Sequence, residues 1–203
     1  MSSAAHTHRL TPTHALFEDV NVLLIALASL ATAASIHVDG KAKFSAGEYL
    51  TIEGRHLDLR VRFPIHGPVE VAIANRKPNL IEITVVAGRD AERAYSVATG
   101  GFANYVNTLF LPFLVTFFQK YRSQVEAKYT NDRLAWPASW QMGWAVRNAV
   151  SHDGLAFERP SQKPVSWRGL EFGPADEPAN SLIKLLNAAD LLLLLFDLER
   201  DRR

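Results

Sequence analysis

The sequence predicts a mainly helical α+β fold with a small antiparallel β-sheet inserted around residues 44–88. Two patterns support this. Apolar residues recur at three- and four-residue spacing over residues 102–121, 138–152 and 179–198, which is typical of helices with a buried face. Residues 56–63 instead alternate between polar and apolar side chains, which is typical of a half-buried strand.

The length and composition indicate one globular domain. The chain has 203 residues, of which 48% are apolar and 21% are charged, an ordinary balance for a folded protein. The net charge of +1 gives no general attraction to nucleic acid or to membranes, so any RNA contact has to be local. The absence of cysteine excludes disulfides, thiol catalysis and cysteine metal sites. It is compatible with a reducing cytoplasm, which is the location we expect.

The N-terminus reads as a tail followed by a helix. Residues 1–12 are mostly small or polar and predict a flexible tail. His6, His8 and His14 could bind a metal, but they come without carboxylates or cysteines, so a tail without metal is the favoured interpretation. A helix is expected over residues 13–36, ended by Asp39 and Gly40.

The same helix raises the question of a membrane span, because residues 20–38 contain no charged side chain. Acidic residues flank this stretch, Glu18 and Asp19 before it and Asp39 after it, and Asn21 and His37 lie inside it. A secretory signal has a basic rather than an acidic start. We therefore expect a buried core helix and no membrane association, with a membrane span and a signal peptide as the alternatives.

Four strands are expected between the first and second long helices. Tyr49–Glu53 is expected to form a hairpin with residues 56–63, and residues 69–74 and 80–86 are further strand candidates between turn-forming prolines and glycines. A short helix is expected over residues 90–98.

The second half is predicted to be mostly helical. Pro112 lies inside the helix over residues 102–121 and predicts a kink or a new start near Leu111. Polar residues 122–132 are expected to be exposed. A helix over residues 138–152 follows, then a loop with a short strand near residues 166–172, and a last helix over residues 179–198.

The helix over residues 138–152 carries the candidate site. It has one apolar stripe and a second line made of Trp140, Trp144, Asn148 and His152, each four residues apart. A helix with two such faces is buried on more than one side. Trp140 and Trp144 are therefore the candidate residues for an interface with a second subunit.

The end of this helix offers a guanidinium, an amide and an imidazole. Arg147 suits a phosphate, His152 can take or give a proton near neutral pH, and Asn148, which is four residues before His152, can orient the imidazole. Arg147 and His152 are about 140° apart on an ideal helix, so they converge only if Asp153 and Gly154 loosen the last turn. Ser151 and Asp153 are candidates for substrate contact, and no metal or cofactor is required.

The segment "RNAVSHDG", with Arg147, Asn148 and His152, resembles the R-x4–6-H motif of HEPN domains, over about residues 138–198. The resemblance implies an antiparallel helical bundle that dimerises, with two motifs facing each other. It implies a metal-independent endoribonuclease of toxin or defence type, with RNA as substrate and a cognate antitoxin as a further partner. His152 would be the general acid or base, Arg147 would stabilise the scissile phosphate, and Asn148 would position the histidine.

Two other interpretations stay open. One is a non-catalytic module on the same fold that binds a nucleotide or dimerises. The other is purely structural: Arg147 would form a surface ion pair, and His152 would cap the C-terminus of its helix, where a cation is favoured.

Overall fold

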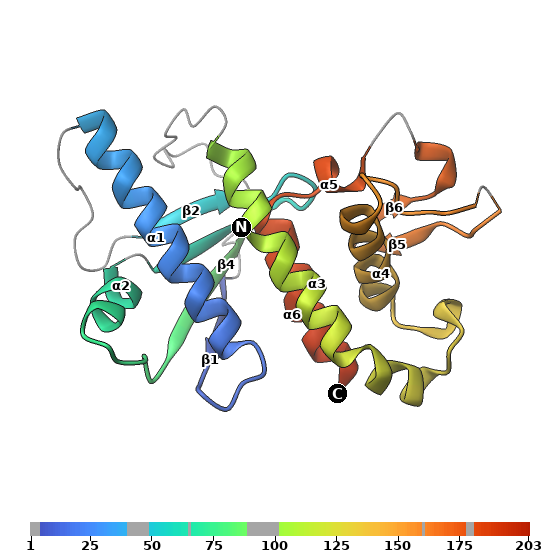
Figure 1. Ribbon diagram of the computed structural model, residues 1–203, viewed down its shortest axis with the longest axis horizontal. Coiled ribbons are helices and arrows are strands. Elements are labelled where there is room, and N and C mark those ends of the chain that lie inside the picture. Colours follow the sequence, from blue (N-terminus) through green and yellow to red (C-terminus); the bar gives the residue numbers. More distant parts are fainter. Residues whose placement is uncertain (1–4, 40–48, 65, 89–101, 160, 178–180) are drawn as a thin grey trace. The chain divides into compact units, whose positions relative to one another are not determined.

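The computed structural model describes residues 5–39, 49–64, 66–88, 102–159, 161–177 and 181–203 (Figure 1). The contacts divide the chain into two compact units. We call Met1–Glu53 with Asp58–Phe102 the N-terminal unit, and Gly54–Leu57 with Ala103–Arg203 the C-terminal unit.

The N-terminal unit is built on a four-stranded antiparallel sheet. Its strands are β1 (Ala5–Leu10), β2 (Tyr49–Glu53), β3 (Leu59–Pro64) and β4 (Ile81–Ala87), in the order β1-β4-β3-β2. The hairpin of β2 with β3 and the strand at β4 are confirmed. The flexible tail is not: residues 5–10 pair with β4 along the whole of β1. Residues 5–10 thus add an edge strand from outside the segment 44–88, in which the whole sheet was expected.

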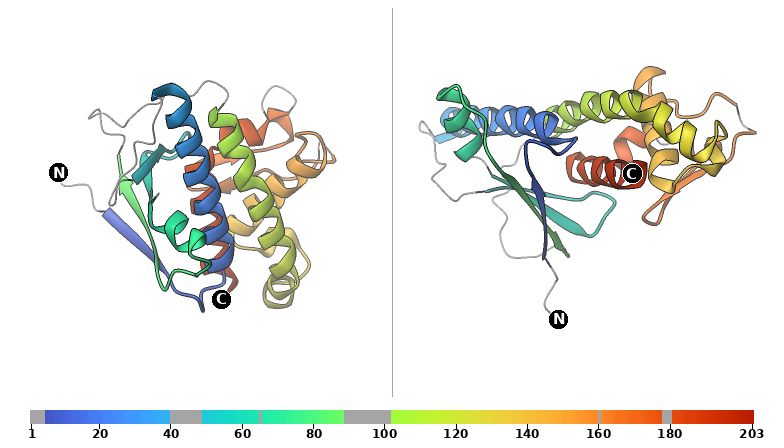
Figure 2. Two further views of the ribbon diagram at one scale, coloured as in Figure 1. Left: turned by 60° about the vertical axis from the view of Figure 1, so that its left-hand side comes forward. Right: turned by 90° about the horizontal axis from the view of Figure 1, so that it is seen from below.

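Helix α1 (Phe17–Asp39) lies across one face of this sheet, as both views of Figure 2 show. Phe17, Leu23 and Leu27 of this helix are buried, as are Val61 and Ile83 of the central strands. This helix contains the stretch for which a membrane span was considered. Among the described residues, none of the helices has the length and apolar character needed to cross a bilayer.

Helix α2 (His66–Ile73) replaces the strand predicted over residues 69–74. Its last turn is helical, since Ala74 N donates to Glu70 O at 3.0 Å and Asn75 then adopts a left-handed φ of 51°. A short apolar run fits either a strand or a helix by periodicity alone, which is why the prediction was wrong. The short helix expected over residues 90–98 lies outside the described residues.

The C-terminal unit holds the long helices α3 (Phe102–Tyr129), α4 (Ala138–Ser151) and α6 (Ala188–Arg202), with the short helix α5 (Leu182–Leu185). A hairpin of β5 (Val165–Trp167) and β6 (Leu170–Phe172) packs on α4, and short 3-10 helices cover Arg133–Ala135 and Pro174–Asp176. Helix α3 continues through Pro112 without a new start, and it includes most of the polar stretch expected to follow it.

The antiparallel helical bundle is contradicted. Near the start of both helices, Ala188 N of α6 donates to Asn107 Oδ1 of α3 at 2.8 Å. Near the end of both, Tyr129 Oη donates to the backbone oxygen of Asp201 at 3.4 Å. Helices α3 and α6 therefore run parallel, and together with the four-stranded sheet they make this an α+β fold rather than a HEPN-like bundle.

One continuous helix was predicted over residues 179–198, but the structure has two, α5 and α6. Asn187 Oδ1 accepts from Asp190 N at 3.2 Å, and Asp190 Oδ2 accepts from Asn187 N at 3.1 Å. This reciprocal capping box starts α6 at Ala188 and separates it from α5.

The fully buried carboxylate of Asp190 also holds the segment Gly54–Leu57 in the C-terminal unit. It accepts backbone N–H bonds from Arg55 at 2.9 Å, His56 at 3.1 Å and Leu57 at 3.0 Å. A Cβ added to Gly54 would lie 2.5 Å from Leu57 O and 3.0 Å from Asp190 Oδ1, so the close approach requires glycine.

Candidate functional site at the end of helix α4

Helix α4 is held in the C-terminal unit by buried contacts at its start. Trp140 is fully buried, and its Nε1 donates to the backbone oxygen of Leu198 at 3.0 Å. Ser139 Oγ donates to Asp201 Oδ2 at 2.6 Å. Trp140 is therefore a core residue and offers no surface to a second subunit, so its proposed place at an interface is wrong.

Trp144 is half-buried, with aromatic and cationic neighbours. The guanidinium carbon of Arg133 lies 4.3 Å from the centre of the Trp144 ring, and the Phe157 ring centre lies 5.9 Å away. Burial lowers the pKa of Arg133, and the charge of Asp132 opposes this shift. Part of the Trp144 ring is thus covered by its own chain, and the rest is available to a partner.

Arg147 is half-buried and held from two sides. Its Nη1 donates to Asn148 Oδ1 at 3.0 Å. The amide of Gln119, oriented with its oxygen toward α4, accepts from Nε at 2.9 Å and from Nη2 at 3.1 Å. A guanidinium has five N–H donors, so this arrangement fixes its plane with three of them and leaves two for a ligand.

Asn148 is buried, with 3% of its surface exposed, and serves Arg147 rather than His152. Its Oδ1 accepts from Arg147, and its Nδ2 donates to Ala156 O at 3.2 Å. Its backbone oxygen accepts from His152 N at 2.9 Å. The Asn148 amide therefore bonds Arg147 and Ala156, and the expected contact of this side chain with the His152 imidazole is not among its hydrogen bonds.

The helix ends as the Asp153-Gly154 pair predicted. His152 leaves helical geometry with φ −132° and ψ 50°, and Asp153 and Gly154 follow with left-handed φ values of 52° and 95°. Gly154 N closes the end by donating to Ala149 O at 2.8 Å. The last turn is closed by regular backbone bonds, from His152 N to Asn148 O at 2.9 Å and from Gly154 N to Ala149 O, so the loosening on which a convergence of Arg147 and His152 depends is not seen.

Ser151, His152 and Asp153 are all exposed. In the described part of the chain the His152 ring has no hydrogen bond or ion pair, so its nitrogens can reach a ligand. Val150 and Leu155, which flank this turn, are 38% and 50% exposed. The end of α4 thus presents an open imidazole between apolar side chains, with a fixed guanidinium one turn earlier.

Gln119, which holds the Arg147 guanidinium, was not identified from the sequence as a site residue. It lies on α3, 28 positions before Arg147, and a polar residue on the exposed face of a helix carries no signal of its partner. Only the packing of α3 beside α4 brings its amide to the guanidinium.

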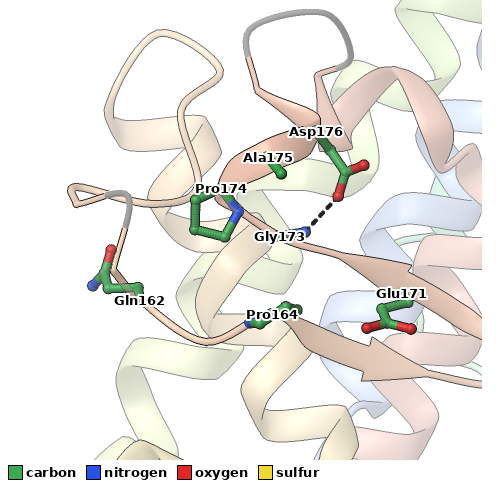
Figure 3. Close-up of a pocket in the computed structure, with 7 residues that line it drawn as sticks. All are labelled: Gln162, Pro164, Glu171, Gly173, Pro174, Ala175 and Asp176. Carbon is green, nitrogen blue, oxygen red and sulfur yellow. Dashed lines mark hydrogen bonds between the residues drawn. The ribbon is translucent and has the colours of Figure 1, made fainter.

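A separate depression of about 540 Å³ lies at the β5–β6 hairpin (Figure 3) and shares no residue with the end of α4. Asp176 turns back toward Gly173 and accepts from its N at 2.7 Å, as the dashed line in Figure 3 shows. Gln162 Oε1 accepts from the backbone N of Glu158 and Arg159. Two polar side chains of this depression, Gln162 and Asp176, are thus hydrogen-bonded to nearby backbone N–H groups, and we assign no candidate chemistry to the depression.

Metal ligands do not gather at either place. Within the residues that the structure describes, there is no group of three or more His, Asp or Glu side chains that could hold an ion.

Comparison of the chain with protein-family models, with curated proteins and with solved structures finds no match.

Proposed function

We propose that the end of α4 binds RNA and cleaves it without a metal ion, with His152 as the proton-transfer group. One observation carries this: an exposed imidazole stands at the C-cap of α4, five residues after a guanidinium that Asn148 and Gln119 hold in place. A fixed guanidinium with donors to spare suits a phosphate, since its planar fork matches two phosphate oxygens.

In the proposed reaction, the ribose 2′-oxygen attacks the adjacent phosphorus while the bond from phosphorus to the 5′-oxygen breaks. One His152 nitrogen accepts the 2′-hydroxyl proton, and the departing 5′-oxygen takes a proton from a second donor. The products are a 2′,3′-cyclic phosphate and a 5′-hydroxyl. Arg147 stabilises the charge that develops on the phosphate oxygens, and Ser151 and Asp153 contact the substrate.

The second proton donor is water or His152 of a second copy. A homodimer in which two helix ends face one RNA would supply both proton-transfer groups. The exposed part of the Trp144 side chain is available for such an interface. A ribonuclease of this kind acts as a toxin or defence protein, held in check by a cognate antitoxin.

The second candidate function is binding without catalysis. Three of the five N–H donors of Arg147 already bond Asn148 and Gln119, which favours this function, since a guanidinium held in this way can have a purely structural role. In that case the helix end holds a nucleotide or supports dimerisation, and His152 transfers no proton.

The two functions are separated by cleavage of a short single-stranded RNA in buffer containing EDTA. We expect the wild-type protein to give 2′,3′-cyclic phosphate ends, and His152→Ala to lose about 10²–10⁴-fold in rate, the usual contribution of general acid–base catalysis. His14→Ala, outside the site, is the matched control and keeps the wild-type rate. Intact RNA with wild-type protein, or equal rates for wild type and His152→Ala, excludes catalysis, and RNA binding without cleavage supports the second function.

A further inference from the structure

Two histidines on the edge strand β1 contact each other. The ring centres of His6 and His8 are 4.6 Å apart, and the ring planes are nearly perpendicular at 86°. Residues two apart on a strand point to the same face of the sheet, so the pair follows from the formation of β1. The sequence favoured a flexible tail here, in which two imidazoles would have no fixed separation.

The register of β1 is fixed on both of its faces. On the opposite face from the histidines, Arg9 Nε bonds Glu82 Oε1 of β4 at 2.9 Å, and the Thr7 and Thr84 hydroxyls lie 3.4 Å apart. On the histidine face, Leu10 is buried with 1% exposure opposite Ile81. A one-residue slip would expose Leu10 and reverse both histidines, so the sheet holds the two rings together.

The spacing of the rings suits a shared metal ion. A transition metal binds an imidazole nitrogen at about 2.0–2.1 Å, which puts the centres of two rings on one ion roughly 4.5–5 Å apart at tetrahedral or square-planar angles. The observed separation falls in this range. Imidazole is a ligand for Zn²⁺, Cu²⁺ and Ni²⁺ rather than for Mg²⁺ or Ca²⁺.

We propose that β1 binds one divalent transition-metal ion, Cu²⁺ or Zn²⁺, through one ring nitrogen each of His6 and His8, with water in the remaining positions. His6 is exposed and His8 half-buried, at an edge of the described sheet, so an ion can enter from solvent. Two protein ligands make this a binding site at the surface. It does not depend on the proposed function of α4.

The test is titration of the full-length chain, free of any histidine tag, with Zn²⁺ and then Cu²⁺ by calorimetry. We expect saturable binding of one ion at the strand. His6→Ala and His8→Ala should each weaken it by roughly tenfold or more, since even the loss of an outer partner of a ligand costs this much. The Cu²⁺ form should show two imidazole nitrogens by electron paramagnetic resonance, and circular dichroism of each variant should match the wild type.

His14→Ala is the matched control, since His14 lies after β1 and its Nδ1 accepts from Leu16 N at 3.2 Å. Its binding should equal that of the wild type. No saturable binding by the wild type, equal binding by the double variant His6→Ala/His8→Ala, or loss of binding in His14→Ala alone would each overturn the proposal.

Discussion

Arg147 donates a 3.0 Å hydrogen bond from Nη1 to the side chain of the residue that follows it, Asn148. Adjacent residues on a helix do not face each other, so this pair forms only because the long arginine side chain reaches back over its neighbour. Burial of the asparagine then fixes the bond, since Nδ2 is anchored on Ala156 O. The amide is thus a positioning group for the guanidinium rather than for the imidazole.

We expect Gln119→Ala to loosen the Arg147 side chain without destabilising the fold. Gln119 is exposed, and surface substitutions usually change the free energy of unfolding by no more than about 0.5 kcal/mol. The loss of two bonds to Nε and Nη2 should broaden the Nε–H resonance of Arg147 in nuclear magnetic resonance spectra. RNA binding should weaken by roughly two- to tenfold.

Gln119→Glu keeps an acceptor and should retain a sharp Arg147 signal, and Lys120→Ala, next to it on α3, is the control for the surface. An Arg147 resonance that is the same in Gln119→Ala as in wild type would contradict the positioning role, whether or not the protein cleaves RNA.

Asp190→Ala should destabilise the protein strongly. The carboxylate is fully buried and accepts from four backbone N–H groups, those of Arg55, His56, Leu57 and Asn187. Its removal leaves these donors buried and unpaired, at a cost of roughly 2–5 kcal/mol. Urea denaturation measures the loss. Asp190→Asn keeps one acceptor oxygen, so its free energy of unfolding should lie between those of the wild type and Asp190→Ala. Glu158→Ala, at an exposed position, should match the wild type.

Asp201 gives the protein an acid-dependent stability. Burial tends to raise its pKa, but hydrogen bonds from Arg200 and Ser139 and the charges of Arg200 and Arg168 outweigh burial and hold the pKa below 3.8. Because the folded-state pKa is lowered, the stabilisation is fully present above the ordinary value and is lost as pH falls through the folded-state pKa.

Asp201→Asn should therefore lower the free energy of unfolding at pH 7, by about 1 kcal/mol or less for a partly exposed ion pair. The difference from wild type should shrink as the pH falls below 3.8 in denaturant titrations. A difference that stays constant between pH 7 and pH 3 would show that the Asp201 charge does not contribute.

Trp140 and Trp144 should behave differently when truncated. Trp140→Ala removes a fully buried ring and should cost roughly 3–5 kcal/mol. Trp140→Phe loses the bond to Leu198 O and part of the ring volume, and should cost less than Trp140→Ala but at least about 1–2 kcal/mol. Trp144→Ala should be milder in denaturation but should lower the mass found by light scattering if the protein forms the proposed dimer. A wild-type monomer mass, or an unchanged dimer in Trp144→Ala, would remove Trp144 from an interface.

Local pattern was enough to predict several elements. Tyr49–Glu53 and α4 were identified at or within one residue of their bounds, and the left-handed end at Asp153 and Gly154 was read from two residues. The "NAAD" sequence after Leu186 carries the capping box that divides the last helix, and its Asn and Asp spacing was a signal available without a structure.

The sequence by itself determined the positions of those helices and strands whose apolar residues recur at a regular spacing, because burial of one face imposes that spacing. It also placed Arg147, Asn148 and His152 at one helix end, because helix geometry is local. Only the tertiary structure decided that residues 5–10 form an edge strand, that α3 and α6 run parallel, that Trp140 is core and that Gln119 holds Arg147. Each of these depends on pairing between segments far apart in the chain, which no short-range pattern records.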